Sequence, residues 1–138
     1  MNYLLDTDIL ISFLQDKYSV AEKMDQIGIE NCYISEISIL ELTYGAYNST
    51  KIEKHLGEVN QVENLFETIP LYSAVEIFAQ EKVRLRKEGN LIPDFDLIIG
   101  CTAVANNMIL VTNNVKHMER VKGLILENWR DSKFNEFL

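Results

Sequence analysis

The chain of 138 residues is long enough for one domain built around a single core. Its net charge of −8 disfavours gripping a nucleic-acid backbone by charge alone and suits the binding of metal cations or a basic partner. No apolar window is long enough to span a membrane, and no basic region precedes the first apolar stretch, so we expect a cytoplasmic protein without a membrane partner. Cys32 and Cys101 lie in apolar segments and are expected to be reduced core residues.

Short apolar runs alternate along the chain with longer stretches of helical spacing. This alternation is typical of βαβ units and predicts an α/β fold with a parallel sheet covered on both faces. The carboxyl ends of parallel strands meet at one edge of the sheet, where binding sites form. In chain order we expect a strand over 3–5, a helix over 9–14, a strand over 32–34, helices over 37–47 and 52–65, a strand over 66–71, helices over 73–88 and 94–106, and strands over 108–111 and 123–126.

Two acids follow the first apolar run directly, in the stretch YLLDTDIL. Asp8 suits a turn or cap leading into the helix over 9–14. Asp6 comes two residues earlier and is expected to lie still on the strand. A buried charge there is costly unless something compensates it, which makes Asp6 a candidate site residue.

A second acid lies within the helix predicted over 37–47. Ile37, Leu40 and Tyr44 fall at i, i+3 and i+7, so we expect them to face the core. Glu41 is at i+4 of that set and would lie in the middle of the apolar stripe. The alternative is that Glu41 lies at the edge of the stripe with its head group in water, and the pattern leaves both open.

A third pair of acids opens the helix over 94–106, whose residues are apolar or small on every side. Such a helix is expected to be buried all round. We assign a capping or first-turn role to Asp94. Asp96 lies deeper against the apolar helix and is the better candidate for a site.

Acids at unusual positions in three separate elements indicate that Asp6, Glu41 and Asp96 converge. Carboxylates packed together repel one another unless protonation or a cation relieves the repulsion. Mg²⁺ and Mn²⁺ are the natural cations, because both accept oxygen ligands. The sequence offers no HExxH motif, cysteine pair, glycine-rich phosphate loop or GxSxG elbow as a rival.

Four stretches in this order resemble the PIN domain, and more narrowly the VapC toxins of toxin–antitoxin pairs: YLLDTDILI, ISILELTYG, IPDFDLIIGCTA, and ILVTNN followed by GLILENW. The resemblance implies that residues 1–138 form a single three-layer α/β/α PIN-like domain with a central parallel sheet of about five strands. It implies an endoribonuclease that cuts tRNA or rRNA loops by means of a Mg²⁺- or Mn²⁺-activated water. It also implies a homodimer and a small antitoxin with a basic C-terminal tail.

The resemblance also assigns roles to individual residues. Asp6, Glu41 and Asp96 match the family's first, second and third acids, which bind metal and act in catalysis. Thr7 and Thr112 match hydroxyl positions that orient carboxylates or water.

The family's fourth acid falls where Asn114 or His117 stands in this sequence, and neither is acidic. Asn114 is expected to supply a neutral oxygen or hold a water, and His117 is expected to be a surface helix residue. This departure predicts one stable ion, with a second completed by substrate phosphate.

Two surfaces allow more than one interpretation. The basic residues of EKVRLRKEG can contact RNA phosphates, although mixed charge is typical of an exposed helix face and we favour that second interpretation. The basic residues of this stretch are Lys82, Arg84, Arg86 and Lys87.

The apolar stripe of the helix over 52–65 can face its own core or a partner.

Two rival functions also have support. LLDTD has the strand–DxD form of HAD-type phosphotransferases, in which Asp6 would be a covalent nucleophile, but Ile9 and Leu10 stand where that family turns with Gly-Thr. A non-catalytic PIN-like interaction module is the other rival, and the presence of all three acids argues against it.

Overall fold

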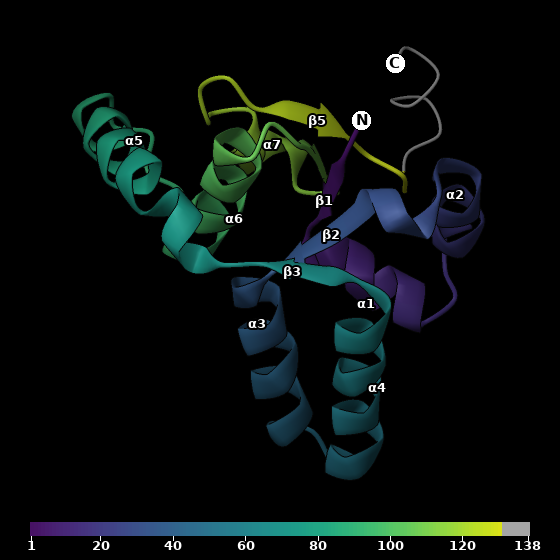
Figure 1. The fold of residues 1–138 in the computed structure, drawn as a ribbon. Coiled ribbons are helices and arrows are strands. Elements are labelled where there is room, and N and C mark those ends of the chain that lie inside the picture. The colour runs from purple at the N-terminus through teal and green to yellow at the C-terminus, as the bar shows by residue number, and fades with distance from the viewer. Residues whose placement is uncertain (131–138) are drawn as a thin grey trace.

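The computed structural model describes residues 1–130, so the last eight residues of the predicted domain lie outside the described part. The strands of this part form one parallel sheet in the order β3-β2-β1-β4-β5 (Figure 1). The elements are β1 (Tyr3–Leu5), α1 (Thr7–Leu14), α2 (Val20–Ile27), β2 (Cys32–Ser35), α3 (Glu36–Tyr47), α4 (Ile52–Leu65), β3 (Glu67–Ile69), α5 (Val75–Lys87), α6 (Asp94–Ala105), β4 (Ile109–Val111), α7 (Val115–Met118) and β5 (Ile125–Glu127), with 3₁₀ turns at Ile29–Asn31 and Leu71–Ala74.

The strand order reverses beside β1. The chain places β2 and β3 on one side of β1 and then crosses to place β4 and β5 on the other. Leu5 pairs with Val111 at the end of both strands, and the Asp6 backbone N–H donates to the Val111 carbonyl at 2.9 Å. Asp6 and Thr112 therefore leave the sheet side by side at the reversal, the place where sites form in open parallel sheets.

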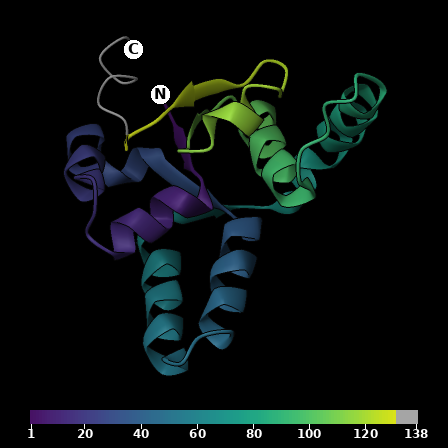
Figure 2. The same ribbon diagram turned by 180° about the vertical axis from the view of Figure 1, so that it is seen from behind.

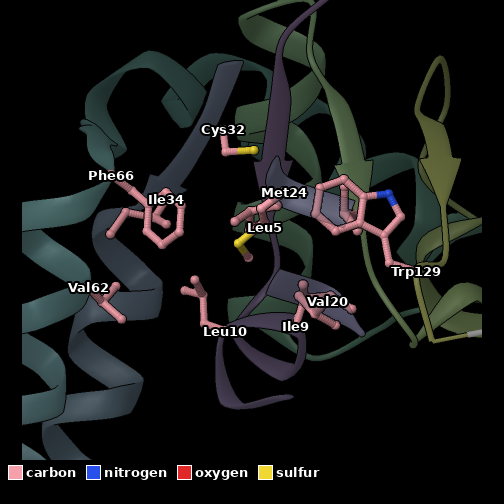
Figure 3. Close-up of a cluster of buried hydrophobic side chains, with 11 residues drawn as sticks. Leu5, Ile9, Leu10, Val20, Met24, Cys32, Ile34, Val62, Phe66 and Trp129 are labelled. Carbon is pink, nitrogen blue, oxygen red and sulfur yellow. The ribbon is translucent and has the colours of Figure 1, made fainter. Parts of the chain in front are cut away.

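Helices cover both faces of the sheet, which confirms the predicted three-layer α/β/α architecture. Because successive strand residues point to opposite faces, Leu5 packs with Ile9 and Met24 of α1 and α2, in the cluster shown in Figure 3. Leu4 points the other way and packs with Ile99 of α6 and Met118 of α7.

Helices α3 and α4 form a hairpin that projects away from the sheet, as the opposite views of Figures 1 and 2 show. The prediction that Leu40 and Tyr44 face the core was wrong, because these side chains are 49% and 68% exposed. The helix is rotated so that Ile39 and Leu42 pack against the α1–α2 side instead. Glu41 consequently lies at the boundary of the buried face, half-buried.

The sequence left open whether the apolar stripe of the helix over 52–65 faces its own core or a partner. In α4, Val59 and Val62 are buried in the core, while the apolar residues at the two ends of the helix are exposed. The expectation that Cys32 and Cys101 are reduced core residues is confirmed, because both are buried free thiols. Helix α2 was not predicted, because its residues are largely polar between the anchors Val20 and Met24. No helix among residues 1–130 is both long and apolar enough to cross a membrane.

Candidate functional site

Asp6 is buried at the reversal of the sheet and caps helix α1. Its Oδ1 accepts a hydrogen bond from the Thr7 backbone N–H at 2.8 Å, and its Oδ2 accepts one from the Thr112 hydroxyl at 2.7 Å. Only 5% of Asp6 is exposed. The expectation that Asp6 lies on the strand and Asp8 provides the cap was wrong, because β1 ends at Leu5 and the Asp6 carboxylate itself accepts the cap bond.

Asp8 lies in the first turn of α1 and belongs to the same group of acids. Its Oδ2 accepts from the Asn113 backbone N–H at 3.0 Å. Its Oδ1 is buried without a hydrogen-bond partner among the described residues, which is unusual for a carboxylate oxygen. Sequence reasoning gave Asp8 a turn or cap role and did not include it among the site residues; the missed signal was its position only two residues after Asp6.

Thr7 connects Glu41 to Asp6. The Thr7 hydroxyl donates to Glu41 Oε1 at 2.7 Å and lies 2.9 Å from the Ser38 hydroxyl. The Thr7 backbone N–H donates to the Asp6 carboxylate. One residue of α1 thus fixes two acids that are 35 positions apart in the sequence.

Asp96 reaches the same region from the first turn of α6. Its Oδ2 accepts from the Asn114 side-chain amide at 3.2 Å, and the Asn114 backbone N–H donates to the Thr112 hydroxyl at 2.9 Å. Helix α6 packs closely on the segment after α7 at Gly100, where an added Cβ would stand 3.2 Å from a methyl of Val121. Asp94 is in the first turn, as expected, and pairs with Lys82.

The acids affect one another electrostatically. Burial, and then the charge of Asp8, raises the pKa of Asp6 to about 7, against the opposing hydrogen bond from Thr112. Burial also raises the pKa of Asp8 and of Glu41, and the charge of Asp96 contributes to both. Because the charges of Asp8 and Asp96 raise the pKa of the neighbouring acids, the cluster of Asp6, Asp8, Glu41 and Asp96 is a region of mutual repulsion between carboxylates.

The donor chemistry of this cluster fits a hard divalent cation. All four acids offer oxygen ligands, and the buried Oδ1 of Asp8 lacks a partner. In residues 1–130, however, no three acidic, histidine or cysteine side chains are close enough together as they stand to hold a metal ion. Each of these acids also accepts a hydrogen bond from a threonine, asparagine or backbone group, so a bound ion requires their side chains to turn toward one another.

Two of the basic residues of α5 that were considered as RNA phosphate contacts, Lys82 and Arg84, pair with acids of the chain instead. Arg84 pairs with Glu81 and Glu88 and donates to the Arg120 carbonyl, which leaves its guanidinium engaged. Arg86 and Lys87 are exposed in the last turn of the helix.

Arg130 is a cation near the acids that sequence reasoning missed. Its positive charge opposes the rise in the pKa of Asp8. The guanidinium carbon lies 4.3 Å from the centre of the Tyr18 ring, and Nη2 donates to the Tyr18 hydroxyl at 2.9 Å. Only the fold brings this residue, from beyond the last strand, close to α1.

Known proteins resemble this chain in sequence. The PIN domain family profile matches residues 3–124, a span that includes Asp6, Glu41 and Asp96. Ribonuclease VapC2 of Rickettsia felis is 33% identical over 133 residues, which cover 94% of this chain and 98% of that protein. The tRNA(fMet)-specific endonuclease VapC of Shigella flexneri is 28% identical over 130 residues, with the same coverage.

Solved structures show the same similarity at the level of the fold. VapBC2 from Rickettsia felis, bound to a DNA fragment from its promoter, superposes with a TM-score of 0.84 at 31% identity, covering 94% of this chain and 99% of that one. DNA-bound VapBC from Salmonella typhimurium gives a TM-score of 0.86 at 25% identity, covering 94% and 98%. Both similarities extend over nearly the whole of each chain.

Proposed function

The chain belongs to the PIN-domain family, and from this premise we propose that it is a Mg²⁺- or Mn²⁺-dependent endoribonuclease that acts as the toxin of a toxin–antitoxin pair. The observation that carries the proposal is the cluster of mutually interacting acids at the carboxyl ends of β1 and β4. Its relatives are ribonucleases by name, and the structures it resembles are toxin–antitoxin complexes.

In this proposal Asp6, Glu41 and Asp96 hold the ion. When bound, a divalent ion neutralises charge on the phosphate and activates a water for in-line attack on the phosphodiester. Thr112 and Thr7 orient Asp6 and Glu41 through their short hydrogen bonds.

Two further side chains act around these three acids. Asn114 positions Asp96 through its side-chain amide. Asp8 offers one more oxygen, the one without a partner. This supply of oxygen ligands supports one tightly held ion.

The covalent alternative has less support. A nucleophilic carboxylate needs one oxygen free to attack phosphorus. Both oxygens of Asp6 already accept hydrogen bonds, one from the backbone of Thr7 and one from Thr112. The carboxylate of Asp6 is therefore better arranged to be held in place as a ligand than to form a phosphoryl intermediate.

The proposed partners follow from charge and exposed surface. A net charge of −8 and the acid cluster favour a small antitoxin with a basic C-terminal tail. We place the cytoplasmic substrate among tRNA or rRNA loops, with Arg86 and Lys87 as candidate phosphate contacts and Arg84 a weaker one. Exposed apolar residues of α3, Leu40, Tyr44 and Tyr47, offer a surface for the antitoxin or for a second copy in a homodimer.

Purified antitoxin-free chain, incubated with a panel of tRNAs and rRNA fragments, tests the proposal. We expect cleavage with Mg²⁺ or Mn²⁺ and none with EDTA. Asp6→Asn should abolish cleavage and remain folded, while Asp94→Asn, which changes an exposed acid two residues from Asp96, should cleave like the unmodified chain.

Three outcomes would overturn the proposal. Cleavage by Asp6→Asn at the unmodified rate would remove the assigned role of the cluster. Trapping of a phosphoryl group on Asp6 would support the phosphotransferase. An intact RNA panel with both metals would support a non-catalytic module.

A further inference from the structure

His117 lies directly beside the acid cluster. It belongs to the short helix α7, which the fully buried Met118 fixes to the core. The His117 Nδ1 is 3.5 Å from Asp96 Oδ2, and 40% of the His117 side chain is exposed. The Nδ1 of His117 therefore faces a proposed metal ligand, Asp96, and the His117 side chain remains partly exposed to solvent.

A single amide group lies between these two side chains. The Asn114 Nδ2 is 3.2 Å from Asp96 Oδ2 and 3.3 Å from His117 Nδ1. An amide NH₂ carries two protons, so it can donate to Asp96 Oδ2 and also to His117 Nδ1 in the tautomer that carries the ring proton on Nε2. The Asn114 amide nitrogen thus lies beside two atoms, Asp96 Oδ2 and His117 Nδ1, that can each donate an electron pair to a cation.

The spacing of the two donors also suits a shared ion. Two neighbouring ligands of an octahedral ion with bonds of about 2.1 Å stand about 3.0 Å apart. The observed 3.5 Å between Nδ1 and Oδ2 needs only a small closure to reach that value. The closure requires the Asn114 amide to turn away or to present its oxygen instead.

The identity of the donor matters for the choice of metal. Mg²⁺ prefers oxygen ligands, whereas transition-metal ions also accept imidazole nitrogen. The other histidine, His55, lies on α4 and pairs with Glu58, so His117 is the histidine that the fold brings to the cluster.

From this arrangement we infer that His117 supplies an imidazole nitrogen to the divalent ion, so that the site favours a transition-metal ion such as Mn²⁺ over Mg²⁺. The inference rests on the proposed function, because it concerns the ion of the same site. It replaces the expectation that His117 is only a surface helix residue.

Pulsed electron paramagnetic resonance of the Mn²⁺-loaded chain tests the inference without reference to activity. We expect nitrogen-14 modulation from a directly bound imidazole in the unmodified chain and in His55→Gln, and its loss in His117→Gln. Calorimetry should show that His117→Gln weakens Mn²⁺ binding by about tenfold or more and leaves Mg²⁺ binding nearly unchanged. His117→Glu, which supplies an oxygen, should also lose the nitrogen signal but bind Mg²⁺ at least as well.

The outcomes separate this inference from the proposed function. Bound Mn²⁺ without nitrogen modulation, or equal Mn²⁺ affinity in His117→Gln and the unmodified chain, would overturn the role of His117 and leave the proposed metal site standing. Failure of the unmodified chain to bind either ion would overturn both.

Discussion

Asp6 and Glu81 are both buried carboxylates, at 5% and 8% exposure, yet their surroundings act in opposite directions. Glu81 accepts hydrogen bonds from Arg84 Nε at 2.9 Å, from Arg84 Nη2 at 2.7 Å and from the Lys122 backbone N–H at 3.1 Å. The bond from Arg84 is the main reason that the pKa of Glu81 is lowered. The pKa of Asp6 is instead raised to about 7, mainly by burial and then by the charge of Asp8.

The difference separates an acid that stabilises the fold from acids suited to function. Glu81 has its own cation, and Arg84 in turn donates to the Arg120 carbonyl, which connects α5 to the segment after α7. The acids around Asp6 share one region and leave the buried Oδ1 of Asp8 without a partner. A buried acid that is matched within the chain contributes to stability, whereas an unmatched group costs stability until a cation arrives from solution.

Among the substitutions, removing the cation of Glu81 should produce the largest change in stability. Arg84→Met leaves the carboxylate buried and unpaired, so we expect the free energy of unfolding, measured in urea, to fall by about 2 kcal/mol. Arg86→Met, on the same helix and exposed, is the control and should change it by less than about 0.5 kcal/mol. Equal losses in the two variants would show that the ion pair is not the stabilising feature.

In the metal-free chain, ionisation of Asp6 should lower stability, whereas ionisation of Glu81 raises it. Because the pKa of Asp6 is raised from 3.8 to about 7, its folded form binds a proton more tightly than its unfolded form. The contribution to stability is therefore complete below the unfolded pKa and is lost as the pH rises through the folded one. We expect the free energy of unfolding in EDTA to fall by about 2 kcal/mol between pH 5 and pH 8.

Asp6→Asn provides the control for this pH dependence, since it removes the titrating group and should flatten most of the fall. The lowered pKa of Glu81 acts in the opposite direction and mainly below this window, because it adds stability as the pH rises through the ordinary value of 4.5. An unchanged slope in Asp6→Asn would assign the effect to other groups.

A smaller gain in stability should follow from neutralising Glu41. Glu41→Gln removes the repulsion from Asp96 and Asp8 but keeps an oxygen that can accept from Thr7. We expect the metal-free melting temperature to rise by a few degrees, equivalent to about 1 kcal/mol. Excess Mn²⁺ should reverse this order, since the unmodified chain gains more from binding. A lower metal-free melting temperature in the variant would show that the hydrogen bond outweighs the repulsion.

The periodic features of the sequence predicted the fold well. Alternation of strands and helices gave the parallel sheet and its two helical layers, and β1 has the predicted bounds Tyr3–Leu5. The rule that sites form at the carboxyl ends of strands led directly to Asp6.

Features that depend on tertiary orientation could not be predicted in the same way. The rotation of α3, which exposes Leu40 and Tyr44, is set by contacts with α1 and α4 and not by periodicity. Whether Asp6 or Asp8 caps α1 depends on where β1 ends, and it ends at Leu5, before Asp6. The approach of His117 to Asp96 depends on how α7 packs against α6, which sequence spacing does not encode.

The most direct test of the central claim is a calorimetric titration of Mn²⁺ into the metal-free chain, Asp96→Asn and Asp94→Asn. If Asp6, Glu41 and Asp96 form one cation site, the chain and Asp94→Asn should each bind one ion with equal affinity. Asp96→Asn should bind it at least about tenfold more weakly. Equal affinity in all three proteins would contradict the account.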